Sequence, residues 1–335
     1  MGEVFIIAEA GVNHNGNPGM AFQLVDVAKS AGVDAVKFQM FNTENLVSVN
    51  APKATYQLQT TNYKESQLEM IRRLELAPDV FSSLASYCAE REIGFIVTPF
   101  DNDSIETLML MELKIFKIPS GEITNLPYLR KLGALQKDII LSTGMSTLEE
   151  VSAAVHVLEI AGTSLSKMTL LHCTTEYPAP FDSVNLRAMQ TLREAFPNVA
   201  GVGYSDHTKG YEVAIAAVAM GATIIEKHFT LDKTMDGPDH KASLEPDELM
   251  AMVKAIRNVE KSFGSDVKKP SPSEYGNIAV VRKSIVASRN ICKGERLTAE
   301  NLTTKRPGTG LSPMFWDMVI NTNAKRDFQK DEAVE

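Results

Sequence analysis

The chain has 335 residues, of which 44% are hydrophobic, so it can bury the core of two domains or of one large barrel with an appendage. Its formal net charge of -8 argues against nucleic acid as a partner, and no apolar run approaches the roughly 20 residues that cross a membrane. The sequence enters an apolar run directly and its three cysteines are scattered, which together favour a cytoplasmic protein.

Short apolar runs alternate with helical patterns through most of the chain. Pro18 suits the first turn of a helix that ends at Gly32, and Ser146 with Glu149 predicts a capping box for a helix that ends at Gly162. A polar excursion, residues 42–67, follows the second run, and loops of this length are commonly functional or disordered. The runs expected to form buried strands are residues 4–8, 35–39, 95–98, 114–119, 138–143, 168–173, 202–207 and 223–229.

Eight strand-then-helix units predict a (β/α)8 TIM barrel, because such connections are right-handed and eight parallel strands close on themselves. An open doubly wound sheet is the alternative, but no GxGxxG turn follows the first strand. We expect the barrel in residues 1–264, a linker in residues 265–277 and a small β-rich module in residues 278–335. The module is short enough that we expect it to lean on the barrel or on a second subunit.

Polar side chains gather at the carboxyl ends of the predicted strands, where a TIM barrel places its active site. Lys37 and Lys117 face the barrel interior at this end, and a buried ammonium group needs an anionic partner. A bound phosphate or carboxylate would satisfy both lysines, with serine hydroxyls as further donors. The alternative is that the two lysines form salt bridges with Glu9 and Glu122.

Two histidines at the ends of the last two strands predict a metal site. Ser205 and His207 share one face of the seventh strand, and Glu226 and His228 share one face of the eighth. If these strands are parallel neighbours, the imidazoles converge and can hold a divalent metal that acts as a Lewis acid. The alternative is that the two histidines are unrelated.

The strand-end motifs, read together, resemble the sialic acid synthase family, also called nonulosonate or N-acetylneuraminate synthases. The C-terminal module resembles the antifreeze-like (SAF) domain of the same enzymes through residues 305–308. The resemblance covers essentially the whole chain, and its motifs are long and occur in the family's order. They are residues 8–16, 36–39, 117–122, 142–145, 204–207, 226–230 and 237–240.

The resemblance implies a transferase that condenses phosphoenolpyruvate with water and the open-chain aldehyde of N-acetylmannosamine, or a close derivative. The products are an N-acetylneuraminate-type nonulosonic acid and phosphate. The resemblance also implies a divalent metal, with Mn²⁺ favoured over Mg²⁺ or Co²⁺. It further implies a domain-swapped homodimer in which the SAF domain of one chain caps the barrel of the other.

Site residues are carried over by motif. His207 and His228 hold the metal and, with Glu9, are counted as catalytic. Glu122 is the candidate that orients or deprotonates the attacking water. Phosphoenolpyruvate is held by Lys37, Lys117, Ser120, Ser142 and Ser205. The sugar is faced by Glu9, Gln39, Asn62, Tyr177 and Asp239, with Arg306 from the partner chain.

Several other functions compete with this interpretation. Legionaminic acid synthases share nearly all of these motifs, so an N,N'-diacetyllegionaminate synthase that uses 2,4-diacetamido-2,4,6-trideoxymannose is the main alternative, and pseudaminic acid synthases are more distant. Thr175 and Thr309 stand where some relatives have Asn, which affects fine contacts only. A non-catalytic carbohydrate-binding or ice-binding protein would not require the lysines and histidines at the barrel mouth. Zinc hydrolase barrels usually carry an HxH pair after the first strand, whereas that loop here carries only His14.

Overall fold

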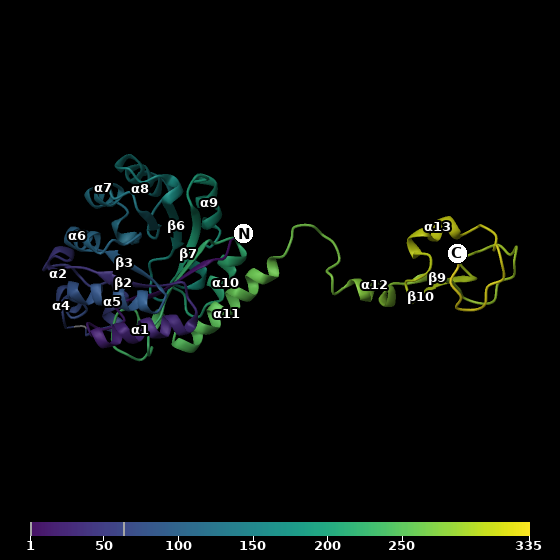
Figure 1. Ribbon diagram of the computed structural model, residues 1–335, viewed down its shortest axis with the longest axis horizontal. Helices are drawn as coiled ribbons and strands as arrows, with labels where there is room; N and C mark the ends of the chain where they lie inside the picture. The colour runs from purple at the N-terminus through teal and green to yellow at the C-terminus, as the bar shows by residue number, and fades with distance from the viewer. Residues whose placement is uncertain (1, 63) are drawn as a thin grey trace. The chain divides into compact units, whose positions relative to one another are not determined.

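The computed structural model describes residues 2–62 and 64–335, with the side chains of all of these except Tyr56 and Gln59. The chain divides into two compact units, one that ends at Phe263 and one that begins at Gly264 (Figure 1). The first unit is a closed barrel whose eight parallel strands follow one another in chain order. This confirms the predicted TIM barrel.

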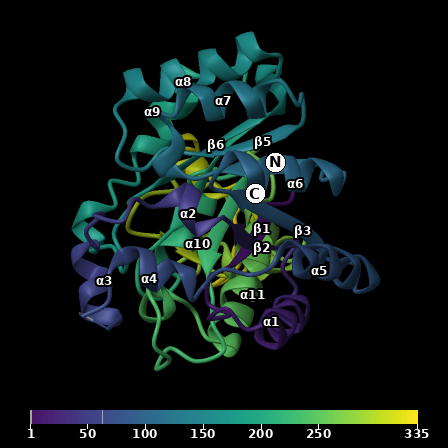
Figure 2. The same cartoon turned by 90° about the vertical axis from the view of Figure 1, so that its left-hand side faces the viewer.

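The strands and helices of the barrel alternate as the hydrophobic pattern predicts. The strands are β1 (Phe5–Gly11), β2 (Ala35–Met40), β3 (Gly94–Pro99), β4 (Ile115–Ile118), β5 (Asp138–Ser142), β6 (Met168–Cys173), β7 (Gly201–Asp206) and β8 (Ile224–His228). The outer helices are α1 (Pro18–Ala31), α5 (Pro78–Glu90), α6 (Asn102–Leu110), α7 (Leu126–Gly133), α8 (Leu148–Ala161), α9 (Ala188–Ala195), α10 (Glu212–Ala219) and α11 (Pro246–Phe263). Helix α1 lies beside α11, and α7 lies beside α8 (Figure 2).

Three details differ from the sequence predictions. The capping box of α8 is formed by Thr147 and Glu150 rather than by Ser146 and Glu149, because the Ser146 hydroxyl instead donates to the Gly144 carbonyl at 3.0 Å. Helix α7, which the sequence did not single out, begins at a cap in which Asn125 accepts from the Tyr128 amide. The excursion after β2 contains two short helices, α2 (Thr43–Leu46) and α3 (Thr55–Thr60), and α4 (Gln67–Arg72) follows it.

The interior of the barrel has an apolar lower layer and a polar upper layer. Alternation along each strand produces both, since residues two apart point to the same side. Ile7 lies in the lower layer and Glu9 above it, and Ala35 and Lys37 repeat the arrangement on β2. A side chain at Gly203 would approach the Ile224 carbonyl oxygen to 2.3 Å, so the lower layer is packed tightly. The packed apolar layer closes the barrel below the polar layer. The polar layer faces the carboxyl ends of the strands.

The second unit has its own small core around an antiparallel pair of strands, β9 (Ser284–Ala287) and β10 (Leu302–Lys305). It also contains α12 (Tyr275–Val281) and α13 (Trp316–Val319). Between Phe263 and Tyr275 the described residues form no helix or strand. Among the helices of residues 2–62 and 64–335, none is long and apolar enough to cross a membrane.

One buried ion pair joins β7 to β8 on the outer face of the barrel, and it gives a prediction about stability. The side chains of Asp206 and Lys227 are 0% exposed and lie 3.0 Å apart. We expect Lys227→Met to lower the free energy of unfolding by about 3–5 kcal/mol, because it leaves the Asp206 carboxylate buried without its counter-ion. Urea denaturation followed by circular dichroism measures the change. The double variant that adds Asp206→Asn is expected to lose less, and a larger loss in the double variant would contradict the explanation.

Candidate active site

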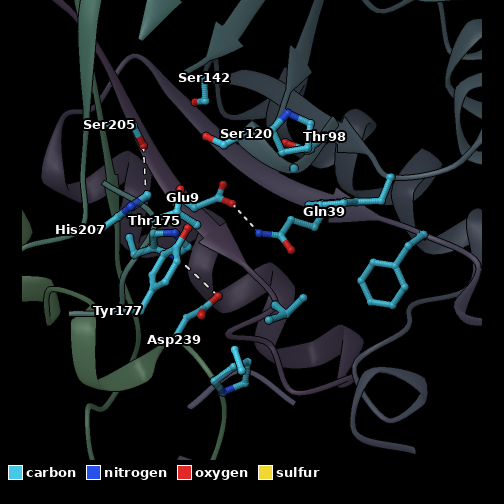
Figure 3. A pocket seen from close by; sticks show the side chains of 18 of the residues that line it. Glu9, Gln39, Thr98, Ser120, Ser142, Thr175, Tyr177, Ser205, His207 and Asp239 are labelled. Atoms are coloured by element: carbon cyan, nitrogen blue, oxygen red, sulfur yellow. Dashed lines mark hydrogen bonds and ion pairs between the residues drawn. The ribbon is translucent and has the colours of Figure 1, made fainter. Parts of the chain in front are cut away.

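A cavity of about 520 Å³ opens at the carboxyl ends of the barrel strands (Figure 3). Most of the residues that the sequence singled out line this cavity. They are Glu9, Lys37, Gln39, Lys117, Ser120, Ser142, Tyr177, Ser205, His207, His228 and Asp239. The barrel brings together side chains from all eight of its strands, including Thr98 on β3, and from the loop after β8. Tyr177 lies beside the histidines, its ring centroid 4.3 Å from that of His207.

Three predicted site residues lie elsewhere. Glu122 is not among the residues that line the cavity, and its carboxylate accepts a hydrogen bond of 2.6 Å from the Asn125 amide. Asn62 lines a neighbouring cavity of about 630 Å³. Arg306 lies in the second unit, where its guanidinium donates to the Val281 carbonyl at 2.9 Å. The roles expected for these residues stay predictions.

A cluster of charges occupies the floor of the cavity. The Lys37 ammonium lies 2.9 Å from the Glu9 carboxylate, and the Lys117 ammonium lies 3.4 Å from Glu226. The same Glu226 oxygen is 3.6 Å from Lys37, so the two lysines share it. Of the pairings expected from the sequence, Lys37 with Glu9 is present, whereas the carboxylate beside Lys117 belongs to Glu226.

The two lysines differ in how fully their charge is compensated. Burial by itself would lower the pKa of Lys37, but the carboxylates of Glu226 and Glu9 raise it by more, so the pKa of Lys37 is raised overall. For Lys117, burial outweighs the attraction of Glu226 and the pKa is lowered. Lys117 also donates to the Ser142 hydroxyl at 2.8 Å. An anion bound beside Lys117 would therefore add the charge compensation that Glu226 alone does not supply.

A cradle of small polar groups lies next to Lys117. The Gly144 amide donates to the Ser120 hydroxyl at 2.9 Å, and the Ser120 hydroxyl contacts the Cys173 thiol at 3.2 Å. The Thr175 hydroxyl is buried, and within the described part of the chain it has no hydrogen-bond partner. A side chain at Gly144 would lie 2.3 Å from this hydroxyl, so glycine keeps the cradle open. Hydroxyl and amide donors beside an ammonium group suit a phosphate.

The two histidines that end β7 and β8 are adjacent and neutral. Their ring centroids are 5.5 Å apart. Burial lowers the pKa of His207 to about 4, and burial followed by the proximity of His207 lowers the pKa of His228 well below its usual value. His207 Nδ1 lies 2.6 Å from the Thr174 carbonyl oxygen and must donate to it, which leaves Nε2 unprotonated, with the Ser205 hydroxyl 3.3 Å away.

These histidines fit a divalent metal. Neutral imidazoles are the form that binds metals, and metal–nitrogen bonds of about 2 Å allow rings at this separation to share one ion. His228 Nδ1 is buried without a hydrogen-bond partner in residues 2–62 and 64–335, at 3.9 Å from an Asp239 carboxylate oxygen. No group of three or more metal-ligating side chains is present in the described residues. Two protein ligands would leave the remaining coordination positions to small molecules.

Next to His228 the cavity presents an amide and two carboxyl groups. The Gln39 amide donates to the Glu9 carboxylate at 3.0 Å, as Figure 3 shows. Strand β1 has a bulge between Glu9 and Gly11, and Gly11 has a φ of 54°, which turns the chain beside Gln39. Burial, followed by repulsion from Glu9, raises the pKa of Asp239 to about 7. This side can accept hydrogen bonds from the hydroxyl or amide groups of a ligand.

The structure adds residues to which the sequence assigned no role. Glu226 was noted only as a polar strand end, and Thr98, whose hydroxyl is 3.1 Å from the Lys37 ammonium, was noted likewise. Their inward position on β8 and β3 was the signal that could have found them. An apolar wall of the cavity is formed by the loop after β1, the segment between β2 and α5, and the loop after β3. The pattern of polar residues at the strand ends did not predict this wall. Its members are Val12, Phe41, Leu46, Met70, Ile71, Leu74 and Phe100.

Comparisons with known proteins agree with this geometry. A model of the NeuB family matches residues 24–268, and a model of the SAF domain matches residues 282–335. The chain belongs to the NeuB family. This confirms the resemblance on which the site residues were selected.

Relatives within the NeuB family span the chain almost completely. An N,N'-diacetyllegionaminic acid synthase of Campylobacter jejuni is 52% identical over 100% of this chain and 99% of its own length. An N-acetylneuraminate-9-phosphate synthase of Mus musculus is 35% identical over 99% of this chain and 92% of its own. A crystal structure of an N-acetylneuraminic acid synthetase from Leptospira borgpetersenii, in complex with citrate, has a TM-score of 0.73 at 34% identity. It covers 83% of this chain and 90% of that chain.

The cradle at Gly144 gives a prediction about anion binding. We expect Gly144→Ala to weaken the binding of phosphoenolpyruvate about tenfold or more, because the methyl group displaces the Thr175 and Ser120 hydroxyls. Isothermal titration calorimetry measures the affinity. Gly121→Ala is the matched control, since Gly121 lines the same cavity and a side chain there would meet no atom within 4 Å. Equal losses in the two variants would contradict the role of the cradle.

Proposed function

We propose that the chain is a phosphoenolpyruvate-dependent nonulosonate synthase. The observation that carries the proposal is that one cavity combines a lysine–hydroxyl anion site with two adjacent neutral imidazoles. The lysine and hydroxyl groups suit an anionic enol phosphate, and a metal on the imidazoles would polarise a carbonyl compound. A reaction between these two substrates requires both kinds of group next to each other. The membership of the chain in the NeuB family supports the same conclusion.

In the proposed reaction, C3 of phosphoenolpyruvate forms a bond to the aldehyde carbon of the acceptor sugar, and the aldehyde oxygen takes up a proton. Water adds to C2 and loses a proton, and the resulting tetrahedral carbon expels phosphate and becomes the 2-keto group. Lys37 and Lys117 hold the anionic groups of phosphoenolpyruvate, with Ser120, Ser142 and Ser205 as hydroxyl donors. Holding both substrates in line supplies much of the rate enhancement.

A divalent metal on His207 and His228, Mn²⁺ in the first instance, supplies Lewis-acid polarisation of the acceptor carbonyl when it is bound. Within the chain, Glu9, Glu226 and Asp239 bring three carboxyl groups to the cavity against two ammonium groups. A dication held beside these carboxyl groups would favour their ionised forms and would allow an anionic substrate to bind next to them. The donor set and the charge of the cavity thus support the same assignment.

The water step is assigned to Glu122. Burial raises the pKa of this carboxyl group, although the hydrogen bond from Asn125 opposes the change, and a raised pKa suits a general base. Because Glu122 does not line the cavity, we propose that its side chain turns away from Asn125 when substrates are bound.

For the acceptor, we favour a 2,4-diacetamido-2,4,6-trideoxymannose over N-acetylmannosamine. Two N,N'-diacetyllegionaminic acid synthases, from Campylobacter jejuni and Legionella pneumophila, are 52% and 47% identical to the chain, against 35% for the mouse N-acetylneuraminate-9-phosphate synthase. The apolar wall of the cavity suits the C6 methyl and the second acetyl methyl of this trideoxy sugar. Gln39, Tyr177 and Asp239 would hold its polar groups.

Three further features belong to the proposal. We infer a domain-swapped homodimer in which Arg306 reaches the acceptor's N-acyl group in the barrel of the partner chain. Asn62 lines the neighbouring cavity, and we propose that it contacts the outer end of the acceptor. The reaction is placed in the cytoplasm, because phosphoenolpyruvate is produced inside cells.

The substrate assignment is tested by following phosphate release from phosphoenolpyruvate and Mn²⁺ with a panel of mannosamine derivatives. We expect turnover with the 2,4-diacetamido sugar, with a kcat/KM about tenfold or more above that for N-acetylmannosamine. A higher kcat/KM for N-acetylmannosamine would reject the acceptor assignment. No turnover with any of these sugars would reject the synthase function. His207→Ala serves as a control and is expected to lose both phosphate release and Mn²⁺ binding, as read by electron paramagnetic resonance.

The swapped dimer is tested by co-expressing Arg306→Ala with His207→Ala. The His207→Ala homodimer is expected to be inactive, and the Arg306→Ala homodimer is expected to be weakly active at a limiting acceptor concentration. A swapped heterodimer pairs an intact barrel with the intact SAF domain of the other chain, so it should recover one full site. Assays of the purified heterodimer, isolated through two affinity tags, measure that recovery. A heterodimer no more active than the homodimers would contradict the exchange of domains.

A further inference from the structure

One lysine in the excursion is almost completely buried. The Lys53 side chain is 2% exposed, and its ammonium group lies 3.0 Å from the Glu65 carboxylate. The same ammonium donates to the Thr61 hydroxyl at 3.0 Å and to the Asn62 carbonyl at 2.8 Å. Because its aliphatic stem is buried and its ammonium group has three acceptors, Lys53 links parts of the chain that the short helices on either side would not otherwise connect.

These contacts reach the wall of the active-site cavity in two steps. The Thr61 hydroxyl, which accepts from Lys53, donates to the Gln57 carbonyl at 2.6 Å. Gln57 lines the cavity, and its side-chain oxygen accepts from the amide of Ala54, which also lines it and directly follows Lys53. The end of α3 is thereby tied to Lys53 through Thr61, and the start of α3 directly follows Lys53 in the chain.

The second branch of the network fixes α4. Glu65, which pairs with Lys53, also pairs with Arg73 at 2.6 Å, just after the end of α4. Helix α4 contributes Gln67, Met70 and Ile71 to the cavity wall. Lys53 therefore connects both helical segments that cover this side of the cavity.

The excursion adjoins the acceptor side of the cavity and not the lysine floor. The Gly237 amide donates to the Thr60 carbonyl at 3.4 Å, which ties the end of α3 to the loop that carries Pro238 and Asp239. By contrast, the hydrogen bonds of Lys37 and Lys117 run to Thr98 and Ser142, on the barrel strands. A shift of the excursion would move the acceptor wall and leave the phosphoenolpyruvate site in place.

We propose that Lys53 is a positioning residue for the acceptor sugar: its ammonium group holds α3 and α4 in the arrangement that forms the acceptor wall. The proposal rests on the function proposed above and extends it to a residue that touches neither substrate. It explains why a buried cation occurs in a segment that is otherwise polar and short of regular structure.

The test compares Lys53→Met, which keeps the aliphatic stem, with Thr61→Val, which removes only the hydroxyl relay. We expect the KM for the acceptor to rise about tenfold in Lys53→Met and about threefold in Thr61→Val, with the KM for phosphoenolpyruvate changed less than about twofold. Arg72→Met is the matched control, since Arg72 lies on α4 but forms an exposed ion pair with Glu44. It is expected to leave both KM values unchanged.

Hydrogen exchange of residues 51–62 provides a readout independent of turnover, and it should accelerate about tenfold in Lys53→Met and not in Arg72→Met. Parallel increases of both KM values, or an unchanged acceptor KM, would overturn the positioning role. Unchanged hydrogen exchange would overturn the proposal that Lys53 holds α3 and α4 in place. A wild-type chain that turns over no sugar in the panel would instead reject the proposed function, so the two failures are distinguishable.

Discussion

Two buried ammonium groups that share one carboxylate form the interaction on which the rest of the site depends. Glu226 reaches Lys37 and Lys117 from β8, although the lysines stand on β2 and β4 and none of these three strands are neighbours in the ring. Only a closed barrel brings side chains from three such strands to one point. The same Glu226 oxygen accepts from the Ser205 hydroxyl at 3.1 Å, so β7 is tied to the cluster as well. Closure of the sheet and assembly of the anion site are therefore one structural event.

Much of this arrangement could be predicted from the sequence. Alternation along each strand places Glu9, Lys37 and His228 on the inward face, because each lies two or four residues beyond an apolar inward residue. Prolines and glycines marked the ends of α1 and α11, since these residues have fixed preferences at helix boundaries. The fold, the cavity and most of its lining residues follow from local rules of this kind.

Other features depend on contacts that local patterns do not encode. Which carboxylate pairs with Lys117 is decided across the barrel, where Glu226 is nearer than the Glu122 that lies five residues along the chain. The α8 cap has two acceptable registers in sequence, and the hydrogen bond from Ser146 to Gly144 selects one. The excursion is organised by Lys53, whose three partners become apparent only when the segment is folded. In each case the outcome depends on contacts between residues far apart in the sequence or on the geometry of individual side chains.

The apolar lower layer that closes the barrel has a consequence for the order of events. With Ile7, Ile140 and Leu171 filling the far end, molecules enter and leave through a single mouth. Anything held on the lysines lies deeper than anything held against Gln39 and the apolar wall. In a cavity that is closed at its far end, the deeper ligand has to bind first. It can leave only after the shallower ligand has dissociated.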